Sequence, residues 1–214
     1  MLAVAFCYVY VYNFFQTWFH TFLVRGRGFS ESGLLLSALP YVVAAAANLG
    51  GGAASDALVR RFGATRGRRV IGSTALAIAG LCTVAAMLTQ RQVPTVMFLA
   101  LTYGAITFQQ SGVFGVCLDV AGPKAGAMVG LMNTAAQVGG LAGSVLYGYL
   151  VNLTGSYNSP FVPMASLLFL GALLWLKVDA SENIVGAVQA GARRVDPEMA
   201  VDFAAEFAAE RREQ

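Results

Sequence analysis

The sequence predicts an all-α integral membrane protein with six transmembrane helices. Hydrophobic residues make up 57% of the 214 residues and charged residues only 12%. Long uncharged runs alternate with short basic or Gly/Pro-rich segments, and no charged residue occurs between Ala125 and Leu176. A helix needs roughly 20 predominantly apolar residues to cross about 30 Å of hydrocarbon, and a charge near its centre is costly. The charges therefore mark where helices leave the bilayer.

The first three predicted spans are bounded by charged segments. Leu2 to Val24 ends at the break Arg25 to Ser32, and Gly33 to Ser55 ends at the break Asp56 to Arg69. The third span, Val70 to Gln90, begins directly after the arginines that close this second break. Each span is free of Asp, Glu, Lys and Arg, which is the pattern that membrane insertion favours.

The last three predicted spans follow the same rule. Val93 to Leu118 begins after Arg91 and Gln92, and Ala125 to Val151 begins after the break Asp119 to Lys124. The sixth span, Phe161 to Lys177, follows the polar break Asn152 to Pro160. Because all five breaks are short, we expect neighbouring helices to pack antiparallel.

Basic residues are unequally distributed between the two sides of such a bundle. If Met1 lies in the cytoplasm, only Arg25, Arg27 and Arg91 of the 14 Lys and Arg lie outside, which leaves 14 − 3 = 11 inside. Cytoplasmic loops are enriched in Lys and Arg, so we expect both termini in the cytoplasm. The net charge of +3 therefore indicates topology, and no nucleic-acid partner is expected. No basic segment precedes the first apolar run, so we expect that run to remain as a span.

The residue types that most enzymes and metal sites require form no recognisable pattern. The chain has one histidine, His20, and no hydrolase, metalloprotease, phosphate-loop or dinucleotide motif. Cys7, Cys82 and Cys117 lie in apolar spans without metal or redox spacing, and we interpret them as packing residues. We expect no enzymatic activity, no metal and no cofactor.

The charge pattern also divides the chain into two parts. We expect residues 1–178 to form the membrane unit and residues 179–214 to form a cytoplasmic tail that is partly helical or disordered.

Polar residues inside the spans recur at helical spacing. In lipid such groups need a hydrogen-bonding partner or a watery cavity. They line a cavity for a polar solute, or they join helices through hydrogen bonds of about 0.6 kcal/mol each; three such faces favour the cavity. The residues are Asn13, Gln16, Thr17 and His20 in the first span, Gln110 and Ser111 with the aromatic Phe114 in the fourth, and Asn133 and Gln137 in the fifth.

Small residues indicate where helices approach closely. Gly126 with Gly130, and Gly139 with Gly143, have the G-x-x-x-G spacing of packed transmembrane helices. The second span contains two runs of small residues, alanines at 44–47 and glycines at 50–52. We expect these segments to be close-packing surfaces.

Three stretches carry a family resemblance. Gly52-Ala53-Ala54-Ser55-Asp56, followed by Arg60-Arg61-Phe62-Gly63 and the arginines of 66–69, resembles the Gly-x-x-x-Asp…Arg…Gly…Arg loop of the major facilitator superfamily. Residues 12–23 with Trp18, followed by residues 25–30, resemble helix seven and its outer loop in the anion/cation symporter branch. Residues 119–156, including Gly130-Leu131 and Asn133-Thr134, resemble that branch from the end of helix ten to the loop before helix twelve.

The resemblance implies the C-terminal six-helix half of a twelve-helix transporter, built of two inverted three-helix repeats. In such proteins the solute site lies between the halves near the midplane. It also implies a bacterial inner-membrane location, a lipid bilayer around the helices, and a small organic anion, such as a sugar acid, carried together with protons. The implied protein partner is the N-terminal half or a second copy of this chain. Alternatively, the chain is an inactive fragment or a membrane scaffold.

The resemblance also implies roles for individual residues. Ser111, Phe114 and Asn133 match the positions that face substrate in the branch, although relatives often have Trp at the position of Phe114. With the polar stripes, the expected substrate-binding set is Asn13, Gln16, Gln110, Ser111, Phe114, Asn133 and Gln137. Asp56, with Arg60 and Arg61, is expected to form a conformational latch against the other half. The charged groups that hold the anion and couple protons are expected in that other half.

Overall fold

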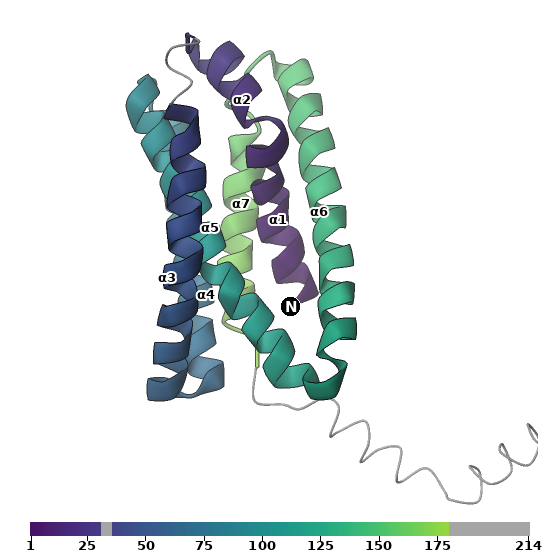
Figure 1. Cartoon of the computed structure of the whole chain (residues 1–214). Helices are drawn as coiled ribbons and strands as arrows, with labels where there is room; N and C mark the ends of the chain where they lie inside the picture. The colour runs from purple at the N-terminus through teal and green to yellow at the C-terminus, as the bar shows by residue number, and fades with distance from the viewer. Residues whose placement is uncertain (31–35, 180–214) are drawn as a thin grey trace, which may run out of the picture.

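The computed structural model describes residues 1–30 and 36–179, and all regular secondary structure in these ranges is helical (Figure 1). A π-helical segment, Phe22–Gly26, and a 3₁₀ turn, Gly122–Lys124, supplement the α-helices. The α-helices are α1 (Leu2–Thr17), α2 (Phe19–Thr21), α3 (Leu39–Phe62), α4 (Ala64–Leu88), α5 (Gln92–Ala121), α6 (Ala125–Thr154) and α7 (Phe161–Trp175). The predicted tail lies outside the described residues, apart from Asp179.

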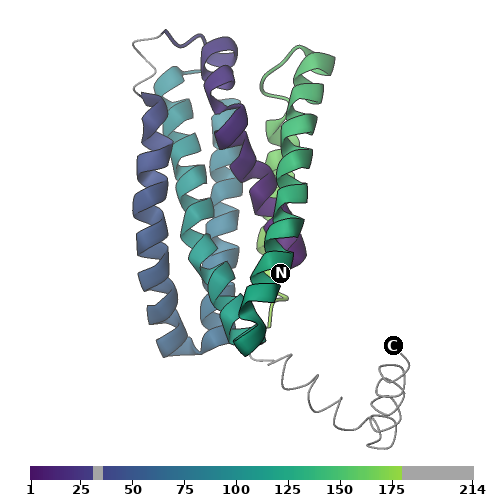
Figure 2. The ribbon, with the colours of Figure 1, turned by 45° about the vertical axis from the view of Figure 1, so that its right-hand side comes forward.

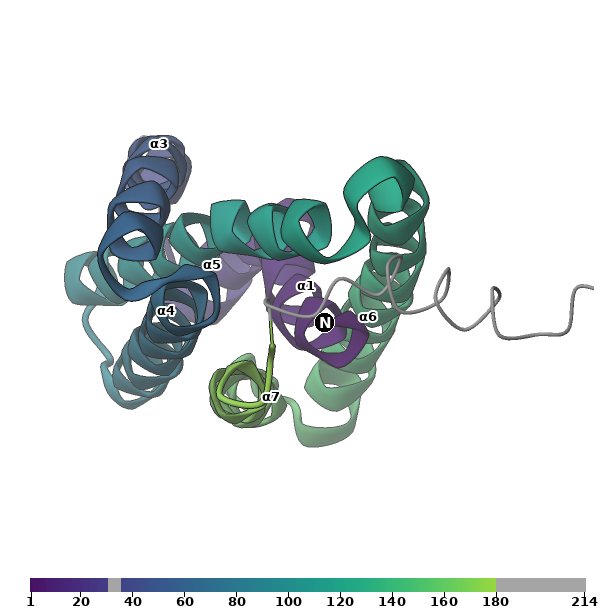
Figure 3. The same cartoon turned by 90° about the horizontal axis from the view of Figure 1, so that it is seen from below.

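Helices from the first and second halves of the sequence pack against one another. α1 packs mainly against α6 and α7, whereas α5 packs mainly against α3 and α4. Seen from below, α1 is enclosed by α5, α6 and α7 (Figure 3). Figure 2 shows α5 and α6 meeting at the end where Gly122–Lys124 joins them. The long helices form two sequential triplets, α1, α3 and α4 and then α5, α6 and α7. The first helix of each triplet therefore packs against helices of the other triplet.

Within residues 1–30 and 36–179, two helices have both the length and the apolar composition needed to cross a membrane. They are Leu36–Phe62, which is α3 with its preceding turn, and α4. α1 and α7 are apolar but have only 16 and 15 residues, while α5 and α6 have 30 residues each and carry polar side chains. That six helices cross the bilayer therefore stays a prediction.

The predicted first span, Leu2 to Val24, is wrong as a single helix because the chain breaks at Trp18. The Trp18 indole donates a hydrogen bond to the Ser144 carbonyl at 3.0 Å and stacks on Tyr147, with ring centroids 5.1 Å apart. Tyr41 donates its hydroxyl proton to the Phe15 carbonyl next to the break. Contacts with α6 and α3 thus stabilise an interruption that hydropathy alone does not reveal.

The predicted break Asp56 to Arg69 is also wrong, since only Gly63 interrupts the helices there. α3 continues to Phe62 and α4 begins at Ala64. Gly63 has φ 82° and ψ 163°, a conformation that side chains disfavour. At Gly67 a Cβ atom would lie 2.7 Å from the Val59 nitrogen, so the two helices form a tight hairpin. The charged residues of this segment therefore do not end the helices.

Close packing is confirmed for one G-x-x-x-G pair and not for the other. A Cβ atom on Gly139 or Gly143 would lie 2.5 Å from a backbone oxygen of α1, that of Phe6 or Tyr10. Gly126 and Gly130 have no atom within 4 Å of such a Cβ, so the expected packing at this pair is wrong for the described residues. In the second span, only Gly51 of residues 50–52 lies tightly against another helix, at the Phe108 backbone.

The core lies where α5 and α1 pass through the middle of the bundle. Cys7 and Cys117 are buried there, as expected for packing residues, and Cys82 is half-buried. The fully buried Trp175 of α7 donates its indole N–H to Gln109 Oε1 at 3.0 Å. This bond joins α7 to α5 and leaves Gln110, the next residue, on another face of the helix.

Candidate functional site

A polar cavity of about 340 Å³ lies between α1, α5 and α6. Amide and phenol side chains dominate its lining, which is unusual in a bundle of this hydrophobicity. The lining residues are Tyr8, Val9, Tyr12, Asn13 and Gln16 from α1, Gln110 from α5, and Asn133, Ala136 and Gln137 from α6. Such groups donate and accept hydrogen bonds without carrying charge.

The close approach of α1 and α6 brings two of the polar stripes together. Gly139 and Gly143 let the α1 backbone lie directly against α6, as described above. A Cβ atom on Gly140 would lie 2.5 Å from Asn13 Nδ2, so the missing side chain leaves room for this amide. Glycines of α6 therefore place Asn13 on the face of α6 that also carries Asn133. Asn133 precedes Gly140 by seven residues, about two helical turns.

A buried tyrosine orients the amide of Gln16. Gln16 Nε2 donates a hydrogen bond to the Tyr103 hydroxyl at 2.8 Å. The Tyr103 ring stacks on Phe15, with centroids 4.4 Å apart, and lies 5.3 Å from the ring of Tyr12. Because Tyr103 is packed on several sides, Gln16 has a fixed partner from α5 at the edge of the cavity.

Five of the seven predicted substrate-binding residues converge on this cavity. They are Asn13, Gln16, Gln110, Asn133 and Gln137. Ser111 and Phe114 do not line it: the Ser111 hydroxyl donates to the Phe108 carbonyl at 3.2 Å, and Phe114 packs half-buried against the core. Each residue of a helix is rotated by about 100° from the last, so Ser111 does not share the face of Gln110. Their role in binding stays a prediction.

Two other members of the first polar stripe lie elsewhere. Thr17 Oγ1 donates to the Asn13 carbonyl at 2.9 Å and lies 3.3 Å from Ser144 Oγ, so it joins helices. His20 is exposed in α2, beyond the break at Trp18. It does not line the polar cavity, although it follows Gln16 by four residues.

The sequence prediction missed two tyrosines of the cavity. Tyr8 and Tyr12 precede Gln16 by eight and four residues, and this spacing places all three on one face of α1. The i, i+4 register was a usable signal. In an apolar helix, however, a tyrosine has the same pattern as a core aromatic residue, so the two could not be distinguished by composition.

A partly buried ion pair was also missed at the end of the bundle that holds Gly63 and Gly122–Lys124, here called the basic end. Arg68 is only 8% exposed, and its Nε lies 2.7 Å from Asp119 Oδ2. Arg68 Nη1 donates to Ser55 Oγ at 3.1 Å, so the guanidinium joins α4 to α5 and α3. Gly115 leaves the space that this guanidinium occupies. Both residues lie in the predicted breaks between spans, so the expectation that the spans themselves hold no charged residue is not contradicted.

The residues of the predicted latch lie on the surface instead. Asp56, Arg60 and Arg61 are exposed, and none of them forms an ion pair with another of the described residues. The Arg61 guanidinium lies 5.3 Å from the centre of the Phe62 ring. A latch that meets a second six-helix unit is compatible with this exposure, and it stays a prediction.

Arg27 closes the opposite end of the bundle. Its guanidinium donates to the Ala86 carbonyl at 3.0 Å and to Gln90 Oε1 at 3.1 Å. Gln92 Nε2 donates back to the Arg27 carbonyl at 3.0 Å. Burial lowers the pKa of Arg27, and the nearby Tyr147 acts in the opposite direction. These bonds hold the segment after α2 against the α4–α5 turn.

Sequence comparison identifies the family. The profile described as the Major Facilitator Superfamily matches residues 1–144, more than half of the chain. The chain belongs to the major facilitator superfamily. The resemblance of the loop motif at residues 52–69 to that superfamily is thereby confirmed, and the members of this superfamily are membrane-embedded transporters and not enzymes.

Individual relatives are named as transporters of sulfoacetate, hexuronate and ascorbate. A probable sulfoacetate transporter of Cupriavidus necator is 32% identical over 194 residues, which cover 87% of this chain and 45% of that protein. A hexuronate transporter of Bacillus subtilis is 31% identical over 78% of this chain and 41% of its own length. A chloroplastic ascorbate transporter of Arabidopsis thaliana is 29% identical over 84% and 34%. The chain spans less than half the length of these relatives.

Proposed function

We propose that residues 1–178 form the C-terminal six-helix half of a secondary transporter for a small organic anion, such as a sugar acid, moved together with protons. The observation that carries this proposal is the polar cavity between α1, α5 and α6. Two helices of one sequential triplet and one of the other contribute to it, which fits a solute site formed by inverted repeats.

The chemistry of the cavity suits the uncharged part of such a solute. Amide groups donate and accept hydrogen bonds with hydroxyl and carboxylate oxygens. Its volume of about 340 Å³ lies at the lower end of the usual range for small-molecule pockets. No Lys, Arg, Asp or Glu is among the lining residues, so we place the groups that neutralise the anion and carry protons in the second half.

Two uncovered helix faces support the requirement for a second half. On α3, Leu49 is 81% exposed and Val42 is 65% exposed. On α6, the open side of Gly126 and Gly130 continues to Leu141, which is 66% exposed. The relatives are more than twice as long as the aligned segment, so a further six-helix unit is the partner that we propose for these faces. A second copy of this chain is the alternative.

The orientation and the latch belong to the same proposal. With Met1 in the cytoplasm of a bacterial cell, the end that carries Asp56 and Arg68 faces inward in the inner membrane, and residues 179–214 follow as a cytoplasmic tail. The Arg68–Asp119 pair holds α4 against α5. The exposed Asp56 is then free to meet an arginine or a helix N-terminus of the other half.

Complementation of halves tests this proposal. The chain is expressed alone and together with the N-terminal half of the sulfoacetate transporter relative, and uptake of labelled sulfoacetate, hexuronates and glucarate is measured. We expect uptake only with both halves. Uptake by the chain alone would favour a homodimer. Failure of both combinations, with both halves present in the membrane and co-purifying, would favour an inactive scaffold.

A further inference from the structure

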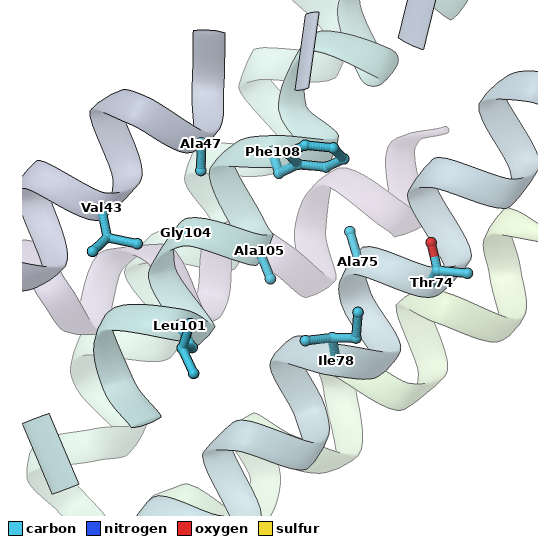
Figure 4. Close-up of a pocket in the computed structure, with 9 residues that line it drawn as sticks. All are labelled: Val43, Ala47, Thr74, Ala75, Ile78, Leu101, Gly104, Ala105 and Phe108. Carbon is cyan, nitrogen blue, oxygen red and sulfur yellow. The ribbon is translucent and has the colours of Figure 1, made fainter. Parts of the chain in front are cut away.

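A second hollow of about 310 Å³ lies on the opposite side of α5 from the polar cavity. It is bounded by α3 and α4, with α5 between them. Figure 4 shows Ala105 and Phe108 of α5 turned toward Ala75 and Ile78 of α4. Phe108 lines this groove and Gln110 lines the polar cavity. Two residues along an α-helix rotate by about 200°, so the two hollows lie back to back.

The groove is apolar and open to the outside of the bundle. Small residues, Ala47, Ala75, Gly104 and Ala105, form the hollow, and Ile78 and Leu101 at its rim are 52% and 51% exposed. The hydroxyl of Thr74 donates to the Val70 carbonyl at 2.6 Å within α4, so it requires no other partner. A ligand of this groove therefore needs apolar surface and no hydrogen-bonding group.

Arg61, at the basic end of the bundle, lies about as far from the groove as a lipid head group lies from the end of its acyl chain. Gly51 of α3 contacts Phe108, which lines the groove. Arg61 follows Gly51 by ten residues, which is about 15 Å along α3 toward the basic end. This equals half of the roughly 30 Å hydrocarbon thickness. Arg61 also lies 14 residues after Ala47, about four helical turns, and so on the same face.

At the basic end, some arginines pair with carboxylates and others do not. Arg68 and Arg69 are paired with Asp119 and Asp179. The exposed Arg60, Arg61 and Arg66 form no ion pair among the described residues. An anionic group from outside the chain would complement them, and basic clusters beside membrane helices attract anionic phospholipids.

We propose that the α3–α4 groove binds an anionic glycerophospholipid. The end of one acyl chain fills the hollow between Ala47, Ala75 and Ala105, and the phosphate lies beside Arg61. This inference requires only a chain embedded in a bilayer. It does not rest on the proposed transport activity, and either one can fail without the other.

Native mass spectrometry of the purified chain tests the site. Palmitoyl-oleoyl phosphatidylglycerol and phosphatidylcholine, which share acyl chains, are titrated separately. We expect phosphatidylglycerol to bind more tightly by about tenfold. Arg61→Gln should reduce this preference and leave the acyl contact intact, whereas Arg66→Gln should not, because Arg66 lies nine residues before Ala75 and so on the opposite face of α4. An Arg61→Gln variant that keeps the full preference for phosphatidylglycerol would show that the head-group assignment is wrong.

Filling the groove tests the acyl site separately. Ala47→Leu with Ala105→Leu should weaken binding of both lipids about tenfold, whereas Ala45→Leu, an exposed position on another face of α3, should not. Leu101→Trp, which covers the groove from its exposed rim, serves if the double variant does not fold. Phosphatidylglycerol with a diazirine at the end of its acyl chain should label residues 101–108. Unchanged affinity in the folded, filled variants would overturn the proposal.

Discussion

Gly143→Ala tests how closely α1 and α6 pack. The added Cβ atom would lie 2.5 Å from the Tyr10 carbonyl oxygen, which belongs to a helix backbone and cannot rotate away. An ordinary contact of this kind needs close to 3.4 Å, so the helices must separate by almost 1 Å. Overpacking of this kind costs about 1 to 3 kcal/mol. The better helix propensity of alanine returns up to about 1 kcal/mol, and we expect a net destabilisation of about 1 to 2 kcal/mol.

Gly130→Ala on the same helix is the matched control. No atom lies within 4 Å of its added Cβ, so only the gain in helix propensity remains and its stability should stay equal or rise slightly. Both variants of the purified chain are compared in one detergent by thermal unfolding, monitored by circular dichroism. Gly143→Ala should melt several degrees lower than the wild type. Equal melting temperatures for the two variants would refute the packing of α1 on α6 and, with it, the geometry of the polar cavity.

Three further predictions concern the two ends of the bundle. Asp119→Asn should destabilise the chain by about 1 to 3 kcal/mol because Arg68 loses its charged partner, and Asp179→Asn, at a more exposed pair, should change thermal stability much less. Cysteines introduced at Ala64 and Ser156 should be labelled from opposite sides of intact cells; labelling of both by an impermeant reagent would contradict the proposed topology. Arg27→Gln should increase hydrogen exchange in the Gln90–Gln92 turn, and unchanged protection would show that Arg27 does not hold that turn.

The sequence predicted the helical class and most helix positions because charge and hydropathy act locally along the chain. The starts of α6 and α7, at Ala125 and Phe161, agree with the predicted spans, and α5 begins within one residue of its own. The interruption at Trp18 could not be predicted, since its contacts come from Ser144 and Tyr147, distant in the sequence. The continuation of α3 to Phe62 was missed because arginines are compatible with helix outside the bilayer.

The candidate site was predictable only as far as helical periodicity reaches. Spacing within one helix correctly grouped Asn13 with Gln16 and Asn133 with Gln137. It could not show which face of α5 meets α1, so Gln110 was grouped with Ser111. That orientation depends on the Gln109–Trp175 hydrogen bond and on the packing of Tyr103. The Arg68–Asp119 pair likewise depends on the tertiary approach of α4 and α5.

Solute affinity of the Asn133→Ala variant tests the central claim, that the polar cavity is a solute site. The measurement uses the complex with an N-terminal half and a labelled organic anion that the complex takes up. Asn133 is exposed in the chain alone, and in this complex the second half would exclude water from it. Removing one hydrogen-bonding partner from such a site costs about 1 to 3 kcal/mol. We therefore expect binding about tenfold weaker. Thr134→Ala is the control, because this exposed hydroxyl on the same helix bonds to the Gly130 carbonyl and does not line the cavity. Normal affinity in folded variants with Asn133→Ala and with Gln137→Ala would contradict the account.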